Sequence, residues 1–308
     1  MWKAGGSVSH WGMSNAKLAL GIASLSLRAK PMAVFAWSRA RWSTALPRAA
    51  TTFCKDRGNP TEMANPAPPE TISVDSASLD ALRQASTASI ATLLFKRGYQ
   101  NAYIQGVLPL SKCEGNMVGP AYTLRYIPTR PDTDPLEAFR EADHPQRVAV
   151  EECPEGHVLV MDCRGDASAA SAGSILLTRM AVRGVAGVVS DGGIRDAAGA
   201  AALDMPVFAA KPSAPTNLTK HHAVDIGLPI ACGCVAGYPG DILVGDDDGV
   251  MVIPRHLVDD IAAETVDMEL FEAFVLEQVQ KGRPTRGLYP PTDPQSLTDF
   301  EAWKAAKA

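Results

Sequence analysis

The segment AGSILLTRMAVRGVAGVVSDGGIRD, residues 172–196, contains the pattern that most restricts the fold of this 308-residue chain. Apolar residues at helical spacing predict a helix over Ser174–Arg183, and Gly184, just past its end, is a typical helix stop. The apolar run Val185–Val189 predicts a buried strand. A glycine-rich loop then leads into a short predicted helix, Asp196–Leu203.

Two flanking strands complete an alternating pattern around this segment. Val158–Met161 precedes it and Pro206–Ala209 follows it, both as short apolar runs. Strands joined by helices at this spacing pair in parallel, because the helix carries the chain back across the sheet. The sequence therefore predicts an α/β domain with a parallel central sheet.

The pattern changes on both sides of this central region. The Asp248–Gly249 pair predicts a tight turn between two short strands. The further predicted elements are a helix at Leu79–Lys96, strands at Ala121–Ile127, Ile230–Cys234, Ile242–Val244 and Val250–Ile253, a long helix at Leu257–Lys281 and a terminal helix at Leu297–Lys307.

Composition excludes several classes of protein. Apolar residues make up 46% and charged residues 20%, which is typical of a globular domain and not of a disordered, collagenous or coiled-coil chain. Six cysteines are too few for a disulfide scaffold. The net charge of −5 argues against nucleic-acid binding, and no apolar run reaches the roughly 20 residues that a membrane span needs.

The first 55 residues differ in charge from the rest of the chain. They contain eight basic residues and none of the 34 acidic ones. A mitochondrial transit peptide, an upstream extension before a true start at Met63, and a basic arm all remain open. We predict a basic extension and linker over residues 1–70, a catalytic domain over 71–285 and a tail with a short helix over 286–308. Free cysteines favour a cytoplasmic location, with mitochondria as the alternative.

The first candidate site is the loop Ser190–Gly199, at the expected carboxyl end of a parallel strand. Ligands of open α/β sheets bind at such ends. Asp191, Arg195 and Asp196 are predicted to gather there. Arg195 offers a planar fork for a carboxylate, and Asp196 offers hard oxygen ligands for Mg²⁺ or Mn²⁺. A solvated Arg–Asp pair in a plain loop is the alternative.

The second candidate is the start of the predicted helix that follows Gly173. The free N–H groups of Ser174, Ile175 and Leu176 would form an anion site, whereas simple capping by Ser171 or Ser174 is the alternative. Together the two segments would supply donors for a carboxylate and a cation for an enolate, which a metal-bound 2-oxo acid requires.

Four motifs in order resemble those of the RraA-like family. They are GHVLVMDCRGD, AGSILLTRMAVRGVAGVVSDGGIRD, MPVFA and YPGDILVGDDDGVMVIP, and the resemblance covers about residues 79–281. The family includes 4-hydroxy-4-methyl-2-oxoglutarate aldolases, oxaloacetate decarboxylases and a regulator of ribonuclease E. The resemblance implies an α/β sandwich similar to the swivelling phosphohistidine domain, with helices flanking mixed sheets, assembled as a homotrimer or hexamer.

The resemblance also implies residue roles. Arg195 matches the arginine that grips the pyruvyl group, Asp196 matches the metal-binding aspartate, and Gly173, Ile175 and Leu176 match the helix start that receives the substrate carboxylate. The implied activity is a Mg²⁺- or Mn²⁺-dependent aldolase or decarboxylase, which cleaves a C–C bond of a small 2-oxo acid through a pyruvate enolate. A non-catalytic ribonuclease-regulator-like binding protein is the alternative.

One position departs from the family pattern. The family's aldolases usually carry an acid twenty-one residues before the arginine, where this chain has Ser174. Asp166 is a candidate substitute. Glu269 and Glu272 are candidates for the acid that an adjacent subunit contributes in the aldolases.

Other motifs are assigned structural roles. We expect His221 and His222 to be structural or exposed, because adjacent side chains point in different directions. Cys232 and Cys234 lack a second pair at zinc spacing. Asp246–Gly249 is predicted to form a turn and not a calcium loop, because the alternating ligands of an EF-hand are absent from the sequence.

Overall fold

The computed structural model describes residues 74–112 and 114–307. The predictions made for residues 1–70 therefore lie outside the described residues. The α-helices are α1 (Ser76–Leu82), α2 (Thr87–Lys96), α3 (Pro145–Glu152), α4 (Ser174–Val182), α5 (Ala197–Ala201), α6 (Val258–Gln280) and α7 (Pro294–Lys307). The strands are β1 (Leu108–Pro109), β2 (Met117–Pro128), β3 (Val158–Asp162), β4 (Ala170–Ala172), β5 (Gly187–Ile194), β6 (Val207–Pro212), β7 (His221–Ile226), β8 (Ile242–Asp246) and β9 (Gly249–Ile253).

The strands form one mixed sheet, in the order β1-β6-β5-β3-β2-β8-β9, with β4 added beside β5 and β7 beside β2. Its centre is parallel, because β2 pairs with β3, β3 with β5 and β5 with β6 in that sense. The predicted parallel core is thus confirmed. The β8–β9 hairpin is antiparallel and turns at Asp248–Gly249, as predicted.

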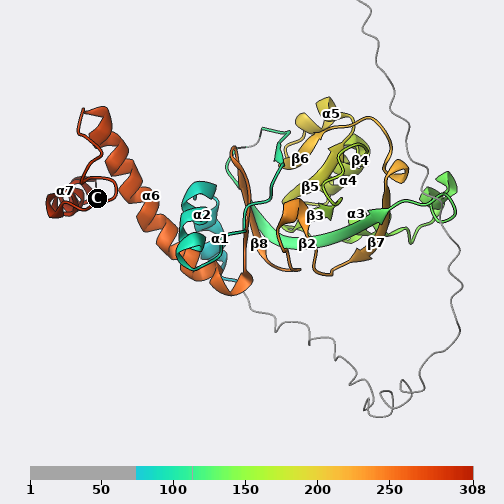
Figure 1. Ribbon diagram of the computed structural model, residues 1–308, viewed down its shortest axis with the longest axis horizontal. Helices are drawn as coiled ribbons and strands as arrows, with labels where there is room; N and C mark the ends of the chain where they lie inside the picture. The colour runs from blue at the N-terminus through green and yellow to red at the C-terminus, as the bar shows by residue number, and fades with distance from the viewer. Residues whose placement is uncertain (1–73, 113, 308) are drawn as a thin grey trace, which may run out of the picture. The chain divides into compact units, whose positions relative to one another are not determined.

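The sheet curls until it nearly closes (Figure 1). The segment before β1 pairs with β9, since Ile104 N–H donates to Val250 O at 2.9 Å and Val252 N–H donates to Ala102 O at 2.8 Å. The chain then enters β1, which pairs with β6 at the other end of the strand order. The predicted α/β fold, with a mixed sheet and flanking helices, is confirmed.

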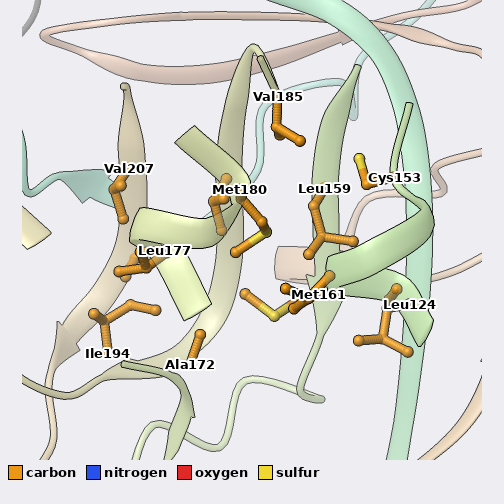
Figure 2. Close-up of a cluster of buried hydrophobic side chains, with 14 of the residues drawn as sticks. Leu124, Cys153, Leu159, Met161, Ala172, Leu177, Met180, Val185, Ile194 and Val207 are labelled. Carbon is orange, nitrogen blue, oxygen red and sulfur yellow. The ribbon is translucent and has the colours of Figure 1, made fainter. Parts of the chain in front are cut away.

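Helices cover the sheet in two groups. α1, α2 and the first half of α6 pack around β8 and β9, and their buried side chains form one apolar cluster. α3 and α4 pack on the parallel strands and form another. Figure 2 shows Leu177 and Met180 of α4 among strand residues such as Leu159 and Ile194. Because Leu177 and Met180 are fully buried, α4 is held firmly on the sheet.

The predicted helix Leu79–Lys96 is two helices. Ser86 caps α2, with its Oγ accepting from Ser89 N–H at 3.1 Å. Asp246 accepts from Thr87 N–H at 2.7 Å, and Glu269 accepts from Ser86 N–H at 2.9 Å. These distant carboxylates stabilise a new helix start, which the local apolar stripe could not indicate.

The predicted strand Ile230–Cys234 is wrong. Cys232–Cys234 forms a 3₁₀ turn in which Gly233 has a φ of 54°. A Cβ at Gly233 would lie 2.6 Å from Ile104 Cγ2 and 2.7 Å from Gln105 N. The close approach of that neighbouring segment bends the chain away from an extended path.

The described helices include none that is both long and apolar enough to cross a membrane. Four of the helices and strands were absent from the sequence prediction, namely α3, β1, β4 and β7. β5 is also longer than predicted, because it continues through Asp191 to Ile194. This extension changes the expected position of Asp191.

Candidate functional site

The candidate site lies where β4 and β5 end side by side. The two strands pair in parallel, with Ala172 opposite Ile194. Arg195 N–H donates to Ala172 O at 3.0 Å, which fixes the register at the strand ends. β4 continues through Gly173 into α4, and β5 continues through Arg195 and Asp196 into α5. The two predicted segments therefore do meet.

Gly173 allows the arginine to lie directly over the helix start. A Cβ at this position would be 2.6 Å from Arg195 Cγ and 3.0 Å from Asp196 Oδ2. The first separation is shorter than real carbon–carbon contacts, so any larger residue would displace Arg195. The absence of a side chain at Gly173 is thus a requirement of the site's geometry.

Asp196 has a strained backbone. Its φ of 57° and ψ of 45° are in the left-handed region, which costs a non-glycine residue about 1–2 kcal/mol. Its side chain does not cap α5. Instead, its Oδ2 accepts from Ser174 Oγ at 3.3 Å and lies 3.5 Å from Arg195 Nε. In this backbone conformation the carboxylate lies beside the α4 start.

The start of α4 is open. Gly173 is the N-cap residue, and no side chain in the described part of the chain forms a capping hydrogen bond there. The first-turn N–H groups of a helix have no intrahelical partner and carry partial positive charge. The predicted capping alternative is therefore not what the structure shows: Ser171 Oγ bonds to Gly193 O, and Ser174 Oγ bonds to Asp196.

These groups border one cavity of about 500 Å³. Its lining residues are Leu136, Phe139, Gln146, Arg147, Ala170, Ser171, Ala172, Gly173, Ile175, Leu176, Arg195, Asp196, Thr216 and Asn217. About half of the Arg195 and Asp196 side-chain surface is exposed, at 47% and 49%. Both charged groups are thus accessible to a small ligand.

Five of the seven predicted site residues line this cavity. They are Gly173, Ile175, Leu176, Arg195 and Asp196. Ser174, the sixth, contacts the cavity's carboxylate through its hydroxyl. Their predicted roles in catalysis and binding stay predictions. The structure does bring Arg195 and Asp196 to the α4 start, as those roles require.

Asp191 does not join the site. It is buried in β5, where it accepts from the N–H groups of Cys163 at 2.6 Å, Gly165 at 2.9 Å and Gly233 at 3.0 Å. Burial raises the pKa of this carboxyl, and the N–H of Gly233 is the largest opposing influence. Asp191 therefore organises three backbone segments, and its expected position beside Arg195 was wrong.

The other candidate acids have different partners within the chain. Asp166 accepts from Ser168 N–H at 2.9 Å, Glu269 caps α2, and Glu272 accepts from Tyr289 O–H at 2.8 Å. None of these three is among the residues that line the cavity. Asp196 is the single carboxylate in that lining.

One wall of the cavity was not predicted from the sequence. It is formed by Phe139 of the 3₁₀ helix Leu136–Arg140, by Gln146 and Arg147 of α3, and by Asn217 of the 3₁₀ helix Asn217–Thr219. Pro145 at the first position of α3 is a helix-start signal that could have identified this helix. Nothing local marks Asn217.

The cavity offers few ligands for a divalent metal ion. The described residues contain no group of three or more His, Cys, Asp or Glu side chains placed to hold an ion. Mg²⁺, however, commonly binds through one or two carboxylates and keeps several waters. Half-exposed Asp196 in an open cavity fits such a largely hydrated ion, and does not fit an ion enclosed by protein ligands.

The histidines and cysteines have structural surroundings. His222 Nδ1 hydrogen-bonds to Asp134, and His221 is buried against Tyr126 with ring centroids 5.5 Å apart. The buried Cys232 contacts Met161 O through its sulfur at 3.7 Å. These contacts agree with the structural roles assigned to His221, His222 and Cys232 from the sequence.

Comparison with known proteins identifies relatives. The RraA-like family model, described as Aldolase/RraA, matches residues 75–252, more than half of the chain. A Halalkalibacterium halodurans protein, provisionally named a 4-hydroxy-4-methyl-2-oxoglutarate aldolase, is 41% identical over 149 residues, which are 48% of this chain and 64% of that protein. Protein DlpA of Legionella pneumophila is 27% identical over 71% of this chain and 34% of its own length. The matches thus span less than two thirds of either relative.

A solved structure agrees with these matches. RraAS2 of Streptomyces coelicolor, described as an unusual member of the RNase ES inhibitor RraA protein family, is 30% identical. It covers 65% of this chain and 96% of its own, with a TM-score of 0.57. The resemblance that the four sequence motifs indicated is confirmed. The chain belongs to the RraA-like family.

Proposed function

We propose that this protein is a divalent-metal-dependent lyase that cleaves a C–C bond of a 2-oxo acid. The reaction would be aldol cleavage of the 4-hydroxy-4-methyl-2-oxoglutarate type, oxaloacetate decarboxylation, or both. The observation that carries the proposal is the meeting of Arg195, Asp196 and the open α4 start in one cavity.

The chain's own groups would divide the binding of substrate between them. The N–H groups of Ser174, Ile175 and Leu176 would receive the carboxylate, as helix starts do for anions. The Arg195 guanidinium would hold the 2-oxo oxygen, on which negative charge develops when the bond breaks. Because Gly173 leaves room above the helix start, both interactions can be made at once.

The proposed cleavage breaks one C–C bond and forms pyruvate. The bond between C3 and C4 breaks, and its electron pair passes into a pyruvate enolate. In decarboxylation the other fragment leaves as CO₂. In aldol cleavage the 4-hydroxyl group gives up its proton to water, and the other fragment leaves as a carbonyl compound. The enolate then takes a proton to give pyruvate. The cavity lining contains no lysine among the described residues, so the proposal does not involve a Schiff base.

Asp196 would hold Mg²⁺ or Mn²⁺ together with waters. When bound, the ion would polarise the 2-oxo group and stabilise its developing negative charge. We also propose a homotrimer or hexamer in which Glu269 or Glu272 of an adjacent subunit supplies a further acid.

A second candidate function is a non-catalytic regulator that binds a partner protein. Two observations favour it, namely Ser174 in place of an acid and the similarity to RraAS2. The regulator would need neither the metal nor a bond-breaking step.

A direct assay separates the two candidates. The full chain is incubated with oxaloacetate and Mg²⁺, and pyruvate is followed with and without EDTA, against a protein-free blank with the same metal. The lyase proposal predicts protein-dependent turnover that EDTA removes. Absence of turnover on oxaloacetate and across a panel of 4-hydroxy-2-oxo acids would contradict it and favour the regulator.

A further inference from the structure

A second cavity, of about 440 Å³, lies among three segments that have no part in the proposed function. They are residues 99–102 before β1, residues 235–241 before β8, and the end of β9 with the 3₁₀ helix Arg255–Leu257. None of its lining residues borders the cavity at the α4 start. We propose that this second cavity binds a small molecule in which a planar aromatic ring carries an anionic group.

The buried part of the lining is apolar and preformed. Ala102, Val235 and Val252 are all buried there. Val252 N–H donates to Ala102 O at 2.8 Å, and Asn101 Nδ2 donates to Cys234 O at 2.8 Å. Because these bonds join the three segments in the absence of a ligand, a flat apolar ring could enter without first rearranging the backbone.

Aromatic side chains form the outer part of the lining. Tyr99 is 38% exposed and Tyr238 is 55% exposed. The Tyr99 hydroxyl lies 3.3 Å from His256 Nε2, and their ring centroids are 6.5 Å apart, so each ring limits the movement of the other. Aromatic side chains pair well with a further ring, in stacked or edge-to-face geometry. The exposed faces of the tyrosines therefore favour a ligand that contains a ring.

Arg255 contributes a positive charge that no residue of the described chain pairs. Its buried Nε has no hydrogen-bond partner, and no described acid forms an ion pair with its guanidinium. Gly240 leaves room for this group, since a Cβ at that position would lie 3.0 Å from Arg255 Nη1. A guanidinium binds carboxylate or phosphate oxygens through several parallel N–H groups. The charge of the cavity therefore favours an anionic ligand.

The single acid of the described lining has other partners. Asp241 is buried, its Oδ2 accepts from Tyr238 N–H at 2.9 Å, and its Oδ1 accepts from the backbone N–H of Arg255 at 3.3 Å. This carboxyl group thus stabilises the turn before β8. The guanidinium of Arg255 remains available to a ligand.

Binding of charged and neutral probes tests the proposal. Indole-2-carboxylate and its carboxamide share a ring but differ in charge, and AMP and adenosine form a second pair with phosphate as the anion. Calorimetry gives their affinities for the full chain as wild type, Arg255→Gln and Ala236→Trp. Ala236 is exposed and lines the cavity, so a tryptophan there would occupy it. Arg286→Gln is the matched control, because Arg286 is exposed and outside the lining.

We expect the wild type to bind at least one of the two anions about tenfold more tightly than its neutral counterpart, because charge-assisted hydrogen bonds are the stronger ones. Arg255→Gln should remove that preference and change the affinity for the neutral probe by less than about twofold, whereas Arg286→Gln should keep both values. Ala236→Trp should weaken the charged and the neutral probe by about tenfold or more, because it fills the space for the ring.

Melting curves establish that each variant is folded, and Ala236→Trp keeps the test decisive if Arg255→Gln does not fold. A preference for indole-2-carboxylate alone would support a carboxylate ligand, and one for AMP alone would support a phosphate ligand. The proposal is overturned if neither anion binds the wild type, or if folded Arg255→Gln keeps the preference. Unchanged binding to folded Ala236→Trp would overturn it too. None of these results bears on the proposed lyase, because the two cavities share no lining residue.

Discussion

Gly173 determines whether Arg195 can reach the α4 start. In Gly173→Ala the new methyl group would meet Arg195 Cγ at 2.6 Å, so the guanidinium must move. We expect kcat/KM for a 2-oxo acid to fall about 100-fold, which is a typical effect of a 1 Å displacement at a reacting centre. Steady-state kinetics with a parallel melting curve checks this. Unchanged kinetics in a folded variant would contradict the placement of Arg195.

The residue at position 174 determines whether one or two carboxylates are available to bind a metal ion. Its hydroxyl lies 3.3 Å from Asp196 Oδ2, so Ser174→Asp would put a second carboxylate beside the first. We expect tighter Mg²⁺ binding, by about tenfold, because Mg²⁺ sites use one or two carboxylates. Calorimetric titration with Mg²⁺ measures the change, with Ser174→Asn as the neutral control. Equal affinity in all three proteins would contradict a metal at Asp196.

Asp191 makes the free energy of unfolding depend on pH. Burial raises the pKa of this carboxyl in the folded state above its ordinary value. The folded state therefore binds the proton more tightly than the unfolded chain, and the contribution to stability is present at low pH and lost as pH rises through the raised pKa. In Asp191→Asn the free energy of unfolding should not fall in this way as pH rises. Urea unfolding of both proteins from the ordinary carboxyl pKa upward measures it, and a parallel decline in both would contradict the assignment.

At the scale of elements, α4 connects the core to the site. Leu177 is fully buried, three residues after the Ser174 that contacts Asp196. Leu177→Ala should lower the free energy of unfolding by about 2–5 kcal/mol, through lost burial and a cavity. Val182→Ala on the same helix is the control, since Val182 is 75% exposed and should change stability by less than about 0.5 kcal/mol. Chemical denaturation distinguishes them, and similar values for the two variants would be inconsistent with the packing of α4.

Elements with a strong local pattern were predictable from the sequence. The parallel strands and α4 were identified because their apolar periodicity and the stop at Gly184 are both local signals. The break between α1 and α2 was missed, because the carboxylates that stabilise the α2 start, Asp246 and Glu269, are distant in the chain. The bend at Gly233 was missed because Ile104, which leaves no room for a side chain there, is also distant in sequence.

The candidate site was predictable in part for the same reason. Arg195 and Asp196 are adjacent in the chain at a strand end, so the sequence already placed them together. Arg147 and Asn217 come from separate short helices, and only the folded chain brings them to the same cavity. Asp191 was misplaced because β5 extends beyond the apolar run that predicted it.

At the scale of the whole domain, the curled sheet explains where the site can form. Each strand of the parallel centre ends at the same edge, and β4 is added there beside β5. The helix that follows β4 therefore starts next to the turn that follows β5. Ligand sites at the carboxyl ends of parallel strands depend on this arrangement.

The central claim is that Arg195 and Asp196 carry lyase chemistry. The most direct test is the initial rate of pyruvate formation from oxaloacetate at saturating Mg²⁺ for the wild type, Arg195→Ala and Asp196→Ala. Arg179→Ala is the control, because Arg179 pairs with Glu151 at the surface. Circular dichroism and melting curves establish that each variant is folded. We predict that the wild type and Arg179→Ala form pyruvate, while the rates of both site variants fall to that of the metal-only blank. Folded site variants with wild-type rates would contradict it.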